Sequence, residues 1–109
     1  MNIESVREYI LLKPFVTEGF PFGEDTLVFK VNGKIFFLAG LDNSPLQFNV
    51  KCDPDKAIEL REVYPESVLP GYHMNKKHWN TIVVDGRLSA NQLKAMIDDS
   101  YALVNPKKG

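Results

Sequence analysis

The chain has 109 residues, of which 44% are hydrophobic and 25% charged, the composition of an ordinary globular protein with one core. This excludes a chain that is disordered throughout, and the formal net charge of −1 gives no overall attraction for nucleic acid. The charges are unevenly placed, because residues 72–109 hold six basic and three acidic side chains. We therefore expect a single domain over residues 1–109 with a basic surface in its C-terminal part.

The number of cysteines and the first residues of the chain indicate the cellular compartment in which the protein is expected. Cys52 is the one cysteine, so no intrachain disulfide can form, which favours a reducing compartment. Residues 1–8 have neither the basic nor the apolar region of a signal peptide. No apolar run approaches the ~20 residues that span a bilayer. We expect a cytoplasmic protein that does not enter the membrane.

The first predicted element is a helix over residues 2–12. Apolar residues recur in it at helical spacing, Asn2 can cap its start, and Pro14 ends it. The loop 19–23 follows, with Gly and Pro around two phenylalanines. We expect these two rings to cover the edge of the domain.

The next pattern predicts a β-hairpin. Asn32-Gly33 separates the strand-like runs 26–31 and 34–39, and both turn residues tolerate the positive φ of a type I′ turn. The expected cross-strand neighbours are Phe29 with Phe36 and Leu27 with Leu38.

A third strand is expected over residues 46–51. Apolar and polar residues alternate there, which predicts one buried and one exposed face. Asp53-Pro54 is typical of a helix start, with Asp as the N-cap and Pro in the first turn. Tyr64-Pro65 is typical of its end.

The C-terminal part is expected to hold a second hairpin over residues 68–84 and then a helix. Ser89 and Gln92 fit a capping box at the start of that helix, and Pro106 closes it. The order α-β-β-β-α-β-β-α predicts an α+β fold in which helices pack on an antiparallel sheet.

The segment 72–80 carries most of the candidate chemistry. Its histidines, His73 and His78, are five residues apart, which places them on neither one helix face nor one strand face. With Cys52 far away in sequence, we expect no metal site and no cofactor. Cys52 or Ser100 could pair with either histidine, but no nucleophile elbow, phosphate loop or paired acidic motif is present. We expect no enzymatic activity.

The same segment suggests a binding surface. At the tip of the second hairpin, Lys76 and Lys77 would attract phosphates, and Asn75 would bond to phosphate or to base edges. His78 or Trp79 could stack on an exposed base. In the alternative interpretation, Trp79 is a core residue and the lysines form a solvated turn. On the exposed sheet face, Gln47, Asn49 and Lys51 either extend the basic surface or only aid solubility.

The run Pro-Gly-Tyr-His-Met-Asn-Lys-Lys-His-Trp-Asn-Thr at residues 70–81 resembles the signature of the YjbR family, also called MmcQ-like proteins. Other segments agree in order, and the resemblance covers almost the whole chain. They are Phe22-Gly23, Gly33-Lys34-Ile35-Phe36, Lys51-Cys52-Asp53-Pro54, and Asp98-Asp99-Ser100-Tyr101 with Val104.

The resemblance implies a small bacterial single-domain protein of a family usually labelled DNA-binding. It implies a fold similar to type III secretion chaperones and to the double-wing DNA-binding domain of a phage transcription factor. It carries no catalytic residues. The signature also has a structural interpretation, in which its polar residues hold the second hairpin against the last helix.

We therefore expect a DNA-binding protein without enzymatic activity, which contacts DNA through the basic β-hairpin and the exposed sheet face. The expected contact residues are Lys51, Asn75, Lys76, Lys77, His78 and Trp79. The alternative is a protein- or peptide-binding adaptor or chaperone-like module. A third possibility is a small-molecule site near residues 19–23. Both a monomer and a homodimer are compatible with the sequence.

Overall fold

A computed structural model of the chain describes residues 1–71 and 74–105. These residues form one six-stranded antiparallel sheet with the strand order β1-β2-β3-β4-β6-β5, together with three helices. The helices are α1 (Ile3–Leu11), α2 (Pro54–Val63) and α3 (Ala90–Val104). The strands are β1 (Val16–Gly19), β2 (Thr26–Val31), β3 (Lys34–Gly40), β4 (Leu46–Lys51), β5 (Val68–Pro70) and β6 (Trp79–Val84). The expected α+β class, with helices on an antiparallel sheet, is confirmed.

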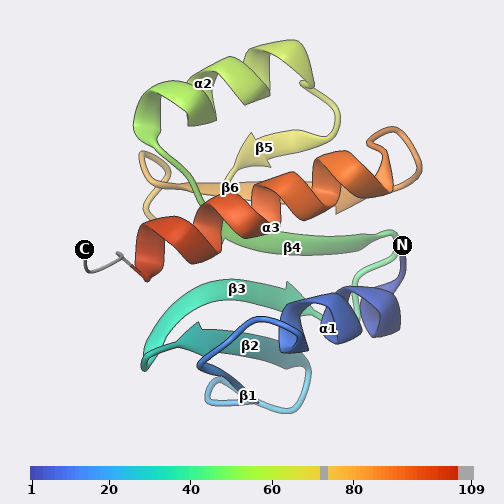
Figure 1. Ribbon diagram of the computed structural model, residues 1–109. Helices are drawn as coiled ribbons and strands as arrows, with labels where there is room; N and C mark the ends of the chain where they lie inside the picture. The colour runs from blue at the N-terminus through green and yellow to red at the C-terminus, as the bar shows by residue number, and fades with distance from the viewer. Residues whose placement is uncertain (72–73, 106–109) are drawn as a thin grey trace.

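All three helices lie on one side of the sheet, and the core fills the space between (Figure 1). Four phenylalanines, Phe29, Phe36, Phe37 and Phe48, are fully buried in it. The rings of Phe37 and Phe48 stack with centroids 4.9 Å apart, and Phe29 meets Phe37 edge to face at 5.5 Å. Burial of such large rings makes a large apolar contribution to the stability of the domain.

We call the opposite side of the sheet the open face. Because side chains alternate along a strand, every second strand residue points there. The open-face residues are Thr17, Thr26, Val28, Lys30, Ile35, Leu38, Gln47, Asn49, Lys51, Leu69, Trp79, Thr81 and Val83. Lys30 and Lys51 are the charged residues in this set, which contains no carboxylate.

The helix starts agree with the capping residues in the sequence. The Asn2 side chain accepts a hydrogen bond from the Ser5 N–H at 2.8 Å, and Asp53 caps α2. At α3, Ser89 and Gln92 form the expected capping box. Each cap satisfies backbone N–H groups that a helix start leaves unpaired.

The structure adds an edge strand, β1, that the predicted order lacks. Its sequence, Val-Thr-Glu-Gly, is short and shows no clear apolar alternation, since both Thr17 and Glu18 are exposed. The loop after β1 does not cover the domain edge as expected. Its rings are largely in solvent, with Phe20 exposed to 49% and Phe22 to 63%.

The expected register of the first hairpin is wrong by one residue. Lys30 pairs with Ile35 as a two-residue turn requires, but a β-bulge then shifts the ladder, so Phe29 pairs with Phe37 and Leu27 with Ala39. The bulge inserts one extra residue, which lets both Phe36 and Phe37 reach the core.

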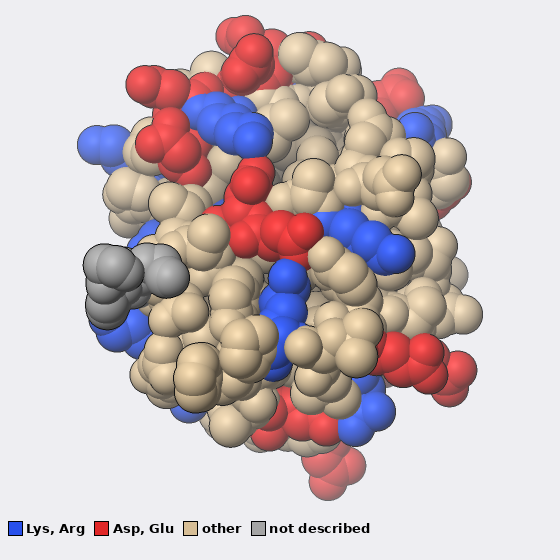
Figure 2. Space-filling model, viewed as in Figure 1, with Lys and Arg blue, Asp and Glu red and all other residues tan. Residues whose placement is uncertain are grey.

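The helix side of the molecule carries charges of both signs close together (Figure 2). Several are ion pairs, including Arg7–Glu18 at 2.6 Å and Lys56–Asp99 at 2.7 Å. None of the helices in the described part of the chain is long and apolar enough to cross a membrane.

Candidate nucleic-acid interface

The connection between β5 and β6, which we call the wing, spans residues 71–78. The structure describes residue 71 and residues 74–78, and His73 lies outside the described residues. Asn75 organises the turn, because its C=O accepts hydrogen bonds from the N–H groups of His78 (3.1 Å) and Trp79 (2.9 Å). Its side-chain Oδ1 accepts from the N–H of Lys77 at 3.0 Å. These bonds leave Lys76 and Lys77 exposed at the tip.

Arg61 of α2 holds the wing from the helix side. Its Nε donates to Oδ1 of buried Asn80 at 2.8 Å. Its Nη2 donates to the C=O groups of Lys76 and, at 3.3 Å, Trp79. The planar guanidinium suits this role because it offers several donors in a fixed geometry. The contacts of Arg61 therefore hold the hairpin against α2. The structural interpretation of the signature, in which its polar residues hold the hairpin against the last helix, includes His73, which lies outside the described residues.

Gly71 allows the two strands of the hairpin to approach closely. Its N–H donates to the C=O of Trp79 at 3.0 Å. A Cβ at Gly71 would lie 2.8 Å from Trp79 Cβ and 2.9 Å from its C=O oxygen, which is too close for any other residue without a shift. The Trp79 side chain is half-buried on the open face, opposite Lys51 in the ladder. Trp79 is thus neither a core residue nor a fully free stacking platform.

Lys51 ends β4 between the two hairpins. Its N–H donates to Oγ of Ser100 at 2.8 Å, and this buried hydroxyl donates in turn to the C=O of Phe36 at 2.7 Å. Ser100 therefore joins β3 and β4 just beyond their last ladder pair, Phe37 with Val50, at the residue Phe36 that the β2–β3 bulge inserts. The backbone of Lys51 is fixed, and its half-buried side chain lies on the open face.

The strand registers bring the two hairpin tips to the same end of the sheet, at the left in Figure 1. We call the five lysines gathered there the basic end: Lys30, Lys34, Lys51, Lys76 and Lys77. None of them forms an ion pair with any residue that the structure describes. The acidic residues of α1 and α2, by contrast, lie on helices on the other side of the sheet.

The groups considered for catalysis or metal binding make mainly structural contacts. Cys52 is buried, and burial raises the pKa of its thiol. Its N–H donates to the C=O of His78 at 2.7 Å, while Ser100 is engaged between two strands. Within the described ranges, no three His, Cys, Asp or Glu side chains are placed to hold a metal ion.

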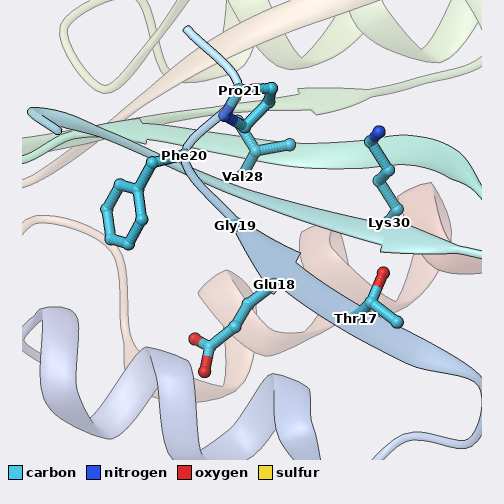
Figure 3. A pocket seen from close by; sticks show the side chains of 7 residues that line it. All are labelled: Thr17, Glu18, Gly19, Phe20, Pro21, Val28 and Lys30. Atoms are coloured by element: carbon cyan, nitrogen blue, oxygen red, sulfur yellow. The ribbon is translucent and has the colours of Figure 1, made fainter. Parts of the chain in front are cut away.

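The region near residues 19–23, considered for a small molecule, contains two surface hollows on either side of β1. One, of about 390 Å³, lies on the open face beside Gly19, Phe20 and Lys30 (Figure 3). The other, of about 510 Å³, lies toward α1 and includes Gly19, Phe20 and Leu41. Their rims include exposed residues, so neither is a closed cavity of the kind that usually buries a ligand.

Sequence reasoning did not identify Arg61 as part of this region. A signal was available, because Arg61 stands four residues after Ala57, and positions i and i+4 share a helix face. Ala57 is fully buried, so an arginine on that face needs hydrogen-bond partners. The partners themselves could not be read from the sequence, since they lie 15 to 19 residues away.

Comparison with known proteins gives a consistent assignment. A model of the YjbR family matches residues 11–103. The uncharacterized protein YbdF of Escherichia coli O157:H7 is 41% identical over 101 residues, covering 93% of this chain and 82% of YbdF. The uncharacterized protein YjbR of Escherichia coli K12 is 29% identical over 102 residues, with 93% and 85% covered.

Solved structures agree with the fold. The crystal structure of the Deinococcus radiodurans protein DR2400, with a domain designated DUF419, superposes with a TM-score of 0.93 at 38% identity, covering 97% of this chain and 80% of that one. A Pseudomonas syringae protein gives a TM-score of 0.77 at 27% identity, covering 95% and 99%. On these matches in sequence and fold, the chain belongs to the YjbR family.

Proposed function

We propose that this protein binds DNA through the basic end of the sheet. The observation that carries the proposal is the gathering of five lysines at one end of the sheet, none with an ion-pair partner among the described residues. Two of them, Lys30 and Lys51, lie on the open face, whose strand residues include no carboxylate. Lysines left without counterions are available to phosphate oxygens, which dominate the affinity of proteins for nucleic acid.

The wing supplies the principal contacts. Lys76 and Lys77 project from a turn that Asn75 shapes and Arg61 anchors, so little further ordering is needed on binding. Lys51 lies at the centre of the basic end, with Trp79 beside it. In this arrangement His78 and Trp79 position the wing, and the exposed part of the Trp79 ring offers a surface on which a base can stack.

The proposed affinity depends strongly on salt. Each neutralised phosphate releases counterions, so with about four or five contacts the affinity is expected to fall about 10²-fold between about 50 mM and about 200 mM salt. The formal net charge of −1 does not prevent this, because the acidic side chains lie mainly on the helix side.

Fluorescence anisotropy of labelled duplex and single-stranded DNA across a salt series tests the proposal. The Lys76→Ala/Lys77→Ala variant is expected to bind about tenfold or more weakly and with a smaller salt slope. The matched control is Lys56→Ala/Lys94→Ala, which removes the same charge from the helix side. Absence of salt-sensitive binding by the folded protein, or equal loss in both double variants, would refute the proposal.

The second candidate is a protein- or peptide-binding adaptor or chaperone-like module. It is favoured by one observation, the large exposed side chains that follow α1 and flank β1. If neither form of DNA binds at low salt, this candidate takes first place.

A further inference from the structure

Most of the large exposed apolar side chains belong to the N-terminal part of the chain, which contains the edge strand β1. Ten large hydrophobic side chains are exposed in the described part of the chain, and seven of them fall within residues 1–41. These seven are Met1, Leu11, Leu12, Phe15, Phe20, Phe22 and Leu41. Apolar surface concentrated in one region of a folded chain is typical of an interaction site.

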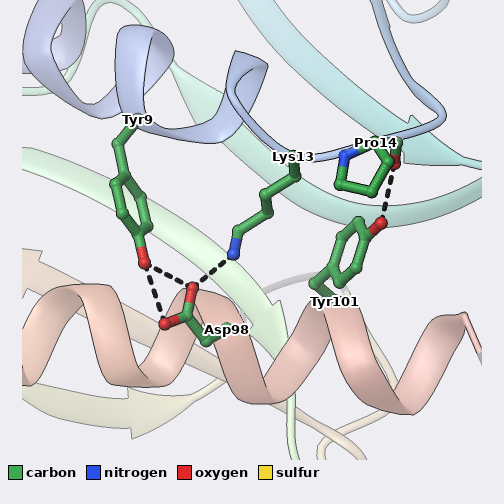
Figure 4. Close-up of polar contacts among 5 residues, drawn as sticks. All are labelled: Tyr9, Lys13, Pro14, Asp98 and Tyr101. Atoms are coloured by element: carbon green, nitrogen blue, oxygen red, sulfur yellow. Dashed lines mark hydrogen bonds and ion pairs between the residues drawn. The ribbon is translucent and has the colours of Figure 1, made fainter.

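Among these exposed apolar residues, Phe15 is the strongest indication of an interaction site. Its side chain is 72% exposed, and its φ of 65° lies in the left-handed region that a bulky residue rarely adopts. The preceding residues are pinned to α3, because Lys13 Nζ pairs with Asp98 at 2.5 Å and the Tyr101 hydroxyl donates to the C=O of Pro14 at 2.7 Å (Figure 4). The fold thus holds a strained backbone whose ring is not used inside the domain, which indicates a use outside it.

The outer edge of β1 also leaves backbone groups facing outward. No strand among the described residues pairs with that edge. The Asn32 N–H donates to the C=O of Phe15 at 3.3 Å, which sets the alternation of the antiparallel ladder. Every second residue from Phe15 onward therefore bonds toward β2, while Val16 and Glu18 turn their N–H and C=O groups away from the sheet.

Gly19, at the other end of β1, leaves open space. A Cβ placed there would meet no atom within 4 Å. The two hollows of about 390 and 510 Å³ both include Gly19 and Phe20 in their walls. The strand therefore has a projecting ring at its start and open space on both faces at its end.

We infer that β1 pairs antiparallel with β1 of a second copy of this chain, about a two-fold axis through Thr17. This register matches Val16 with Glu18 of the second copy, so the outward backbone groups of both residues are paired. It also sets Phe15 beside Gly19 of the second copy, where the hollows can receive the ring. A two-fold interface must be self-complementary, and a ring and a hollow at equal distances from Thr17 meet that requirement.

The available surface is sufficient for such a dimer. A phenylalanine side chain buries roughly 200 Å², so the exposed parts of Phe15, Phe20 and Phe22 offer several hundred Å² on each copy. With the strand edge and Leu12 added, the total is on the order of 1,000 Å², the lower limit for a specific interface. This favours a dimer of modest affinity, which forms with rising protein concentration.

Sedimentation velocity over a concentration series up to the millimolar range tests the inference, with wild type compared to Phe15→Gly. Glycine accepts the positive φ without strain, so the variant is expected to fold with unchanged or raised thermal stability. Association is expected to weaken about 100-fold, about tenfold for each of the two rings that symmetry removes. Ile58→Ala, which trims a 53% exposed side chain on α2, is the control and should dimerise as wild type does.

A cross-link tests the register directly. The two-fold axis makes Thr17 a non-hydrogen-bonded pair with its counterpart, where Cα atoms lie about 4.5 Å apart, a distance that a disulfide can bridge. Thr17→Cys is expected to form a covalent dimer on mild oxidation, whereas wild type, whose Cys52 is buried, should not. A monomer at all concentrations, or a dimer that is unaffected by Phe15→Gly and not cross-linked through residue 17, would overturn the inference.

Discussion

Arg61 offers a test of how the wing is held. Replacement by alanine removes three hydrogen bonds, of which the one to Asn80 lies in the buried region. Lys76 is exposed, so water can replace the bond to its C=O, but the Asn80 side chain would lose a charge-assisted bond without replacement. Such a loss costs about 2–3 kcal/mol in the free energy of unfolding.

Replacement of Arg61 by lysine is expected to have a smaller effect on stability than replacement by alanine. Arg61→Lys keeps the positive charge, but an ammonium group cannot reach Asn80 and the wing in the planar geometry of a guanidinium. We expect this variant to lose about 1 kcal/mol and to bind DNA more weakly although the charge is unchanged. Arg87→Ala is the control, because Arg87 is exposed and its ion pairs with Glu66 and Asp85 are at 3.2 and 3.3 Å. Surface pairs of this kind contribute little, so its stability should stay within about 0.5 kcal/mol of wild type.

Urea unfolding and amide hydrogen exchange measure the two effects separately. The amides of Gly71, His78 and Trp79 are bonded within the wing, and they are expected to exchange faster in both Arg61 variants while core amides keep their order of protection. If Arg61→Ala unfolds at the same urea concentration as wild type and these three amides remain protected, Arg61 does not hold the wing.

Three further changes test other contacts. Ser100→Ala leaves the buried C=O of Phe36 and the partly buried N–H of Lys51 without their partner, and urea unfolding should show a loss of about 2–4 kcal/mol. A loss near zero would contradict the role of this hydroxyl at the bulge. Gly71→Ala forces the chain against Trp79 and should cost about 1–3 kcal/mol, with disturbed indole fluorescence as a second readout. Burial and the hydrogen bonds to Asp98 raise the pKa of Tyr9 to about 12. The folded state therefore holds this proton more tightly, so the stability gained is complete below about pH 10 and is lost as the pH rises toward 12. Asp98→Asn should lower the pKa of Tyr9 in an ultraviolet titration and flatten that loss of stability, and an unchanged titration would show that Asp98 has no part in it.

Local signals in the sequence predicted local structure well. Asn32-Gly33 specifies its turn through backbone conformation alone, and Asn32 and Gly33 indeed have φ of 51° and 82°. The caps at Asp53 and Ser89 likewise act within a few residues of the chain. The bulge at Phe36 could not be predicted in this way, because its cause is the packing of two adjacent rings into one core. The edge strand β1 escaped prediction because an exposed strand needs no apolar alternation.

The candidate site likewise combines local features, which the sequence indicates, with features that depend on contacts between distant parts of the chain. The sequence indicated the lysines of the wing, but it could not show that they share one end of the sheet with Lys30 and Lys34, since that depends on the register of β3 and β4. Nor could it show the clamp by Arg61, which joins helix α2 to a turn far along the chain. The functional roles of Lys51, Asn75, Lys76, Lys77, His78 and Trp79 stay predictions that the binding experiments test.

The wing and β1 lie at opposite edges of the sheet, so DNA binding by Lys76 and Lys77 need not compete with dimerisation, although Lys30 borders both surfaces. Pairing through β1 about a two-fold axis perpendicular to the sheet would join two sheets into one and keep both open faces on the same side. The two wings would then stand about ten strand spacings apart, roughly 50 Å before twist is considered. At 3.4 Å per base pair, a duplex shorter than about 15 base pairs reaches one wing only. If both proposals hold, a longer duplex should bind more tightly to wild type than to Phe15→Gly, whereas a short duplex should not distinguish them. Equal binding of both proteins to the long duplex would show that each domain acts on DNA alone.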